Sequence, residues 1–251
     1  MKKLLSLLLV FAFVVTSGVL FSACELKAPV DVKIGEETYS YKTLNEAIRT
    51  ETVEGIIEIT LNKNLVLDEA IDLTKNEYVL NLNGHKISFP TNQATALIRV
   101  QDTAKLTING DGIIDSASQN NDYSIAIWAR NGGEVILNGG TYTNVGARAF
   151  EEDGTSPNNN ELIYASGTGS SIVINGGTYI GNYENTTWGT RYTLNIHDKD
   201  ASSFVVKGGE FRQYDPANSL SENPKGNFVD SGYVSTVETR NGVQWFVVSA
   251  E

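Results

Sequence analysis

The chain has 251 residues, of which 41% are hydrophobic and 20% are charged, and it contains one cysteine. This composition excludes a disordered chain, a collagen-like fibre and a small domain held together by disulfides. The formal net charge of −11 argues against nucleic acid as a partner, because an acidic surface repels phosphate groups.

The first 23 residues are predicted to be a secretory signal peptide. Two lysines precede an apolar run from Leu4 to Val15, and small residues lead to the only cysteine, Cys24. The segment Phe21-Ser22-Ala23-Cys24 resembles a bacterial lipobox, although Phe21 stands where Leu is preferred. The resemblance implies lipidation of Cys24 and anchoring of the protein to a membrane of the bacterial cell envelope. An ordinary secretory signal with an unmodified cysteine is the alternative.

Residues 24–31 are expected to form a tether, and residues 32–251 a single domain with covered ends. Thr43-Leu44-Asn45-Glu46 fits a helix capping box, and Gly55 is a stop signal. We therefore predict a helix from Thr43 to Glu54 that covers the N-terminal end of this domain.

The middle of the chain contains an internal repeat. Five strand-like segments end in glycine, at residues 80–84, 106–110, 135–139, 172–176 and 204–208. A second strand-like segment precedes four of them, at Ala96–Val100, Ile125–Ala129, Leu162–Ser166 and Leu194–His197, and a third follows each glycine. Three short strands per repeat, stacked on their neighbours, describe an all-β, single-stranded parallel β-helix of about five coils.

Stacking of the coils places equivalent side chains over one another. We expect a hydrogen-bonded ladder of asparagines, each at a bend that needs the left-handed backbone region: Asn83, Asn109, Asn138 and Asn175. We also expect an interior stack just after this bend: Ile87, Ile113, Tyr142, Tyr179 and Phe211.

Alternation along the second strand identifies a candidate ligand-binding row. Arg99 and Trp128 are predicted to point outward from adjacent coils, and the same count places His197 two coils above Trp128. A strict count gives Leu73 below Arg99, so Asp72 joins the row only if that coil slips by one residue. A Trp beside an Arg suits a sugar ring and a uronate carboxylate. Alternatively, the loop from Asn144 to Asn160 folds over Trp128 and buries it.

Two further features concern the outer surface and the C-terminal end. The outward positions Ile136, Val173 and Val205 are apolar, which predicts a cover by a long loop or the C-terminal segment, with a partner protein as second choice. Asn241-Gly242 lies between two strand-like segments and predicts a hairpin from Tyr233 to Val248 that closes the last coil.

These segments resemble the right-handed parallel β-helix proteins of the pectin-lyase-like fold. The start and end of the domain look closer to bacterial surface proteins of uncharacterised role; the matching segments are residues 32–35, 41–48, 80–87, 208–211, 215–216 and 230–234. The resemblance spans nearly the whole mature chain. It implies a fold and no particular activity.

Enzymes of this fold include calcium-dependent pectate lyases and polygalacturonases with clustered aspartates. The chain has no Asp-Asp pair and only two histidines, His85 and His197, so neither catalytic set nor a His-rich metal site is recognisable. The sequence favours a non-catalytic envelope protein that binds polysaccharide or serves in adhesion, without cofactor or metal. The alternatives are a polysaccharide lyase or glycoside hydrolase acting on acidic glycans through Arg99, Asp72 and His197 around Trp128, and a purely structural surface protein. The sequence leaves the oligomeric state open.

Overall fold

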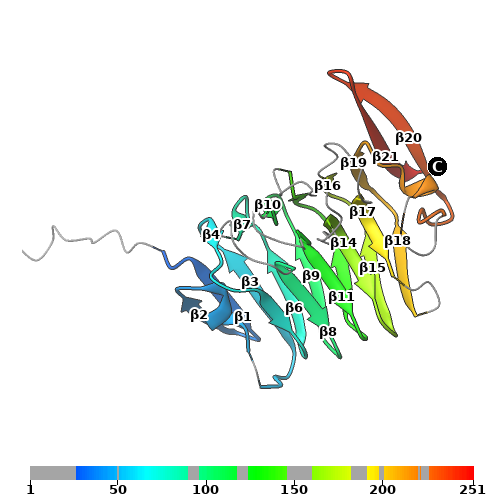
Figure 1. The fold of residues 1–251 in the computed structure, drawn as a ribbon. Helices are drawn as coiled ribbons and strands as arrows, with labels where there is room; N and C mark the ends of the chain where they lie inside the picture. The colour runs from blue at the N-terminus through cyan, green and yellow to red at the C-terminus, as the bar shows by residue number, and fades with distance from the viewer. Residues whose placement is uncertain are drawn as a thin grey trace, which may run out of the picture.

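The computed structural model shows an all-β protein with three sheets of stacked strands (Figure 1). The structure describes residues 27–49, 51–89, 96–117, 124–145, 160–181, 191–197, 201–219, 221 and 226–251. Cys24 and the predicted signal peptide lie outside these residues.

Sheet A has eight strands. In spatial order they are β18 (Ser202–Val206), β15 (Ser170–Ile174), β12 (Glu134–Leu137), β9 (Lys105–Asn109), β6 (Glu77–Asn81), β3 (Ile56–Leu61), β1 (Val30–Ile34) and β2 (Glu37–Tyr41). The strands from β3 to β18 are parallel, whereas β1 and β2 add an antiparallel hairpin at the N-terminal end.

Sheet B also has eight strands. Their order is β20 (Tyr233–Arg240), β21 (Val243–Ala250), β19 (Gly209–Arg212), β16 (Thr178–Ile180), β13 (Thr141–Thr143), β10 (Ile113–Asp115), β7 (Lys86–Ser88) and β4 (Leu65–Val66). Sheet C has five parallel strands, in the order β17 (Arg191–Ile196), β14 (Asn160–Ser166), β11 (Ile127–Arg130), β8 (Ile98–Gln101) and β5 (Ile71–Leu73).

From β3 onward the chain visits sheets A, B and C in turn, so each repeat adds one strand to each sheet. This confirms the prediction of three short parallel strands per repeat, and the arrangement is compatible with a parallel β-helix. The core lies between the three sheets because alternate side chains of the repeat strands point inward, where they stack on their equivalents in the next repeat.

The interior aromatic stack is confirmed, with one correction. Tyr142 and Tyr179 are stacked with ring centroids 5.1 Å apart, and Tyr179 and Phe211 with centroids 4.7 Å apart. The isoleucine in register with Tyr142 is Ile114, whereas Ile113 points outward and is 39% exposed. The bend before β10 has one more residue than the bend before β13, which moves the inward position by one.

The asparagine ladder is confirmed for three of its four expected members. Asn175 donates to Asn138 and Asn138 donates to Asn109, both at 2.8 Å, and Asn109 donates to Asn81 at 3.3 Å. Asn81 therefore replaces Asn83, because the first repeat has two extra residues before its glycine. Of the four asparagines expected to have left-handed backbone, only Asn83 has a positive φ, of 52°.

The predicted N-terminal helix is shorter than expected. Helix α2 (Leu44–Ala47) begins at the N-cap Thr43, and the capping box with Glu46 is present. It ends before Ile48, not at Glu54, because the backbone of Ile48 is extended, with φ of −79° and ψ of 125°. The segment that follows bonds to the first repeat instead: Tyr78 donates to Arg49 O and the Asn76 side chain donates to Glu51 O. Strand β1 also begins at Val30, so residues 30 and 31 belong to sheet A and not to the tether.

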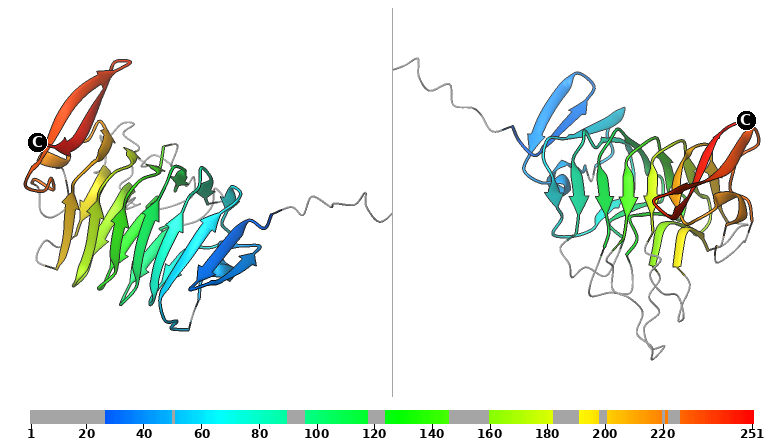
Figure 2. Two further views of the ribbon diagram at one scale, coloured as in Figure 1. Left: turned by 180° about the vertical axis from the view of Figure 1, so that it is seen from behind. Right: turned by 90° about the horizontal axis from the view of Figure 1, so that it is seen from above.

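The C-terminal hairpin forms as predicted, and it covers the last repeat in part: β21 pairs with β19, and Val248 is buried in the core. Asn241 and Gly242 have φ of 53° and 78°, as a two-residue hairpin turn requires, and β21 pairs with β19. The hairpin thereby extends sheet B beyond the stack, at the opposite end from β1 and β2 (Figure 2). Tyr214 and Phe228 also cover the interior, where they pack on Phe211 and Phe204, respectively.

Candidate functional site

The strand register of sheet C aligns some of the candidate residues. One residue of each repeat is in register: Asp72, Arg99, Trp128, Tyr164 and Asn195, of which Asn195 is fully buried. Asp72 is in the row, so the slip that its membership required has occurred. His197 is not in the row: it lies two residues beyond Asn195 and is exposed.

The turn from sheet C to sheet A explains why a count finds His197, whereas the slip at Asp72 comes from the two extra residues before Gly84. Counting back from the glycines assumes that this turn has the same length in every repeat. Trp128 and Tyr164 are in register in sheet C, and Glu134 and Ser171 are in register in sheet A. However, seven positions separate Tyr164 from Ser171, one more than separate Trp128 from Glu134. The path from Asn195 to Ser203 is longer by a further residue. A glycine-based count therefore misses Tyr164 and overshoots Asn195 to reach His197.

Asp72 and Arg99 form a two-pronged ion pair between β5 and β8. The Arg99 Nε lies 2.5 Å from Asp72 Oδ1, and its Nη2 contacts Oδ2. The side chains are 41% and 25% exposed, respectively, so the pair is formed at the surface of the sheet. Both carboxylate oxygens of Asp72 accept hydrogen bonds from one guanidinium, and this two-pronged contact fixes the orientation of the carboxylate.

Trp128 is half-buried and is held by three neighbours. Its indole Nε1 donates to Ser166 Oγ at 2.8 Å. The Arg130 guanidinium carbon lies 4.8 Å from the Trp128 ring centroid, and the Tyr164 ring lies at 5.4 Å with its plane tilted by 34°. Trp128 and Tyr164 thus present adjoining aromatic surfaces on successive repeats, flanked by cations.

A second outward row runs beside the first. Gln101, Arg130 and Ser166 are aligned in it, two residues after Arg99, Trp128 and Tyr164. His197 follows the Ala165–Ile196 pair by one residue, which places it next to Ser166 in this row. His197 therefore belongs to the same face of sheet C as Trp128 but is displaced along the strand.

Alternation along β11 already implies Arg130, since it is two residues from Trp128 on the same strand. Tyr164 and Ser166 could not be assigned in this way, because their alignment depends on the length of the turn. The loop that was expected to cover Trp128 lies outside the described residues from 146 to 159. Its effect on Trp128 therefore remains an expectation.

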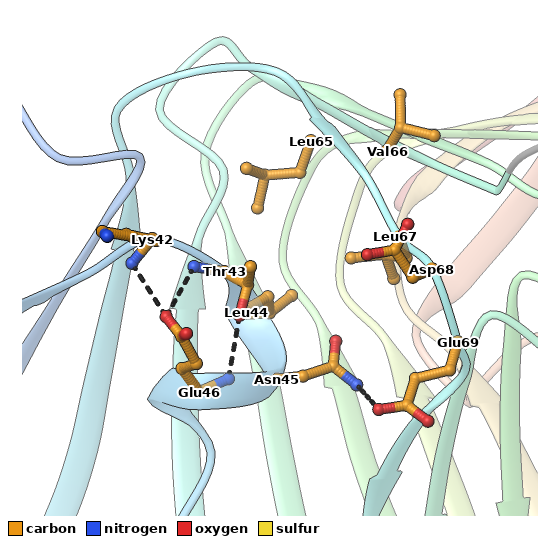
Figure 3. Close-up of a pocket in the computed structure, with 10 residues that line it drawn as sticks. All are labelled: Lys42, Thr43, Leu44, Asn45, Glu46, Leu65, Val66, Leu67, Asp68 and Glu69. Carbon is orange, nitrogen blue, oxygen red and sulfur yellow. Dashed lines mark hydrogen bonds between the residues drawn. The ribbon is translucent and has the colours of Figure 1, made fainter.

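A cavity of about 300 Å³ lies between α2 and the segment that follows β4 (Figure 3). Several of its polar side chains are already engaged within the cap. Glu46 accepts from the backbone N–H of Lys42 and Thr43, and Asn45 donates to Glu69 across the cavity at 3.1 Å. We interpret this cavity as part of the N-terminal cap. Within the described part of the chain, no group of three or more His, Cys, Asp or Glu side chains could hold a metal ion.

Comparisons with protein-family models, curated proteins and solved structures found no match to the chain. Among the described residues, no helix is both long enough and apolar enough to cross a membrane.

Proposed function

We propose that this protein is a lipid-anchored component of a bacterial envelope that binds an acidic polysaccharide through sheet C, without catalysis. The observation that carries the proposal is the continuous row of Asp72, Arg99, Trp128 and Tyr164 on successive repeats. A glycan chain lying along the stack would meet one side chain of the row about every 4.8 Å. Aromatic rings pack on sugar faces, and the nearby guanidinium groups attract carboxylates.

The proposed scaffold is a right-handed parallel β-helix of about five coils, of the pectin-lyase-like kind. The cycling of the chain through sheets A, B and C supports this, because every pair of parallel strands in one sheet is joined by a long crossover. Such crossovers are right-handed in about 98% of known cases. The proposed anchor is Cys24 at the lipobox-like segment, and several buried acyl chains would give stable attachment to a membrane.

A binding role is favoured over acid–base catalysis by the state of the charged groups. A lyase needs a basic side chain free to remove a proton, whereas Arg99 is engaged with Asp72 through two hydrogen bonds. Arg130 is the second cation of the site, and its guanidinium lies over the Trp128 ring. Asp72 balances the charge of Arg99, so Arg130 is the cation placed to attract and orient an anionic ligand.

Substitution of Trp128 by alanine tests the proposed site. We expect Trp128→Ala to weaken binding of the acidic polysaccharide by at least about tenfold, since stacking and cation–π contacts are each worth about 1 kcal/mol or more. Binding is measured by a glycan array and then by titration calorimetry. The matched control is Trp245→Ala, because Trp245 on β21 is also half-buried and also lies beneath an arginine, Arg240, at 5.3 Å.

Equal loss of binding in both tryptophan variants, or none in either, would contradict the assignment to sheet C. Circular dichroism of each variant separates loss of binding from unfolding. A folded wild-type protein that binds no glycan would support the purely structural alternative.

The enzymatic alternative draws on the alignment of Asp72 with Arg99 and requires that a substrate displace their ion pair. It predicts release of unsaturated or reducing ends from an acidic polysaccharide. Turnover that is abolished by Arg99→Ala, in a variant that still folds, would establish this alternative and overturn the non-catalytic proposal.

A further inference from the structure

The outer face of sheet A carries a mostly apolar row that the proposed glycan site does not use. Its members, in stacking order, are Val79, Thr107, Ile136, Val173 and Val205. Ile136 is 38% exposed, and the valines are partly exposed. The C-terminal hairpin, one of the two expected covers, extends sheet B instead. A contiguous apolar row on an outer face indicates a contact with something other than water.

The chain enters the domain beside this same face. Lys27, the first residue that the structure describes, has its Nζ 3.4 Å from Asp31 Oδ2 on β1. The next residue is held as well, because the Asn62 side chain donates both to the Ala28 carbonyl at 3.0 Å and to Asp31 at 2.9 Å. Lys27 and Asp31 line a shallow hollow of about 250 Å³ together with outward side chains of β1, β2 and β3, which are Lys33, Thr38, Glu58 and Thr60. Lys27 therefore lies against the outer face of sheet A, at its N-terminal end.

This placement determines where the proposed lipid anchor meets the domain. Cys24 lies three residues before Lys27, and an extended chain spans at most about 3.6 Å per residue, so their Cα atoms are no more than about 11 Å apart. The acyl chains of a lipidated Cys24 would begin within that distance of Lys27. A membrane that holds them is therefore close to one end of the outer face of sheet A. This step rests on the proposed function, because it requires the anchor.

The charges on this face do not oppose a phospholipid surface. Together with Lys27, the outward side chains of the strands from β1 to β18 include three lysines and four carboxylates, so the face has a net charge of −1 in a chain of −11. Three of the carboxylates are paired with lysines: Asp31 with Lys27, Glu58 with Lys33 at 4.0 Å, and Glu134 with Lys105 at 2.9 Å. An anionic membrane therefore repels this face less than it repels the rest of the protein.

We propose that the anchored protein lies on the membrane, with the outer face of sheet A against the phospholipid headgroups and the apolar row at the centre of the contact. The stacking direction is then parallel to the membrane surface. The other orientation is a protein that stands on its N-terminal end. In that orientation β18 is about 29 Å farther from the membrane than β1, because six strand spacings of about 4.8 Å separate them. The apolar row would then stay in water.

The anchor makes a weak contact sufficient. Because the acyl chains already confine the protein to the surface, sheet A meets the headgroups at a high effective concentration. Burial of four partly exposed aliphatic side chains then favours the lying orientation over the standing one. The candidate glycan row from Asp72 to Tyr164 runs along the stack, so a polysaccharide bound there is held parallel to the membrane.

Fluorescence quenching of the full lipidated chain, reconstituted in vesicles of phosphatidylcholine and phosphatidylglycerol, tests this orientation. Lipidation consumes the only cysteine, so the cysteine introduced by Ile136→Cys, Val205→Cys or Ile113→Cys can be labelled alone. We expect lipids with a nitroxide on the headgroup to quench a label at residues 136 and 205 at least about threefold more than at residue 113. Ile113 is the matched control, because it is 39% exposed and lies on the outer face of sheet B.

Two results overturn the orientation. Quenching at residue 205 that is no stronger than at residue 113 would mean that the far end of sheet A is away from the membrane. Quenching at residue 205 that is unchanged after addition of Ile136→Glu would mean that the apolar row does not hold the face, whereas we expect this change to reduce it and Ile113→Glu to leave it unaltered. Circular dichroism of each variant separates these effects from unfolding.

Failure of the orientation is distinguishable from failure of the proposed function. The mass of the mature N-terminus shows whether Cys24 is acylated. An unmodified Cys24 overturns the anchor and the orientation together, whereas an acylated chain with an unquenched label at residue 205 overturns the orientation alone. Glycan binding by Trp128→Ala is measured without vesicles, so it tests sheet C independently of both.

Discussion

At the residue scale, stacking leaves some positions no room for a side chain. A Cβ added at Gly133 would lie 2.0 Å from the carbonyl oxygen of Val100 in the repeat below. Similarly, a Cβ at Gly112 would lie 2.5 Å from the Cβ of Leu82, whose buried side chain fills the wide bend of the first repeat. These glycines are thus required by close approach between repeats.

We expect Gly133→Ala to lower the free energy of unfolding by about 2 kcal/mol or more, because backbone atoms of two repeats must move apart. The matched control is Gly226→Ala, where no atom lies within 4 Å of the added Cβ. Urea denaturation followed by circular dichroism compares the two variants. Equal stability of both would show that the repeats are not packed as closely as described.

Residue-scale errors in the sequence analysis have one origin. Alternation assigned inward and outward faces correctly for Trp128 and Tyr142, because both lie inside regular strands. Ile113 and His197 were misassigned because each was aligned by counting from a glycine across a bend, and the length of that bend differs between repeats. The hydrophobic pattern determines the faces of a strand, whereas its register against the next repeat depends on backbone geometry at the bends.

At the element scale, the C-terminal hairpin is attached to the stack by pairing with one strand and by an ion pair. Arg240 of β20 donates to both carboxylate oxygens of Glu210 on β19, at 2.8 and 3.0 Å. These hydrogen bonds lower the pKa of the Glu210 carboxyl below its usual value of 4.5. The hairpin therefore has a charge-dependent attachment in addition to its backbone hydrogen bonds.

The lowered pKa of Glu210 predicts how this attachment depends on pH. The folded state favours the charged carboxylate, so the contribution is fully present above pH 4.5 and is lost as the pH falls through the folded pKa. We expect amide exchange in β21 to accelerate, relative to β13, as the medium is acidified through this range. In Glu210→Gln this acid-dependent step should be absent. A step of unchanged size in that variant would assign it to another group.

At the scale of the whole molecule, the repeats contact only their neighbours, so stability should vary along the stack. Most residues of the end strands, β2 and β20, are exposed, whereas each strand in the middle is hydrogen-bonded to a neighbouring strand at both of its edges. The sequence predicted this architecture because its strands recur with glycine at the same place. It could not predict the exact end covers, since Tyr214 and Phe228 have no counterpart in the repeats.

We expect native-state amide exchange to be slowest in β9, β12 and β15 and fastest in β2 and β20, because opening can begin at either end of the stack. Exchange measured by mass spectrometry or NMR resolves these strands. Uniform protection from β2 to β20 would show that the molecule opens only as a single cooperative unit.

The turn from sheet C to sheet A grows by one residue in each of the last two repeats, and both sheets stay in register. Insertions at this corner are thus absorbed without moving the inward or outward rows of either sheet. Such a corner lets evolution lengthen the chain by single-codon steps, while the hydrophobic centre and both outer faces stay the same.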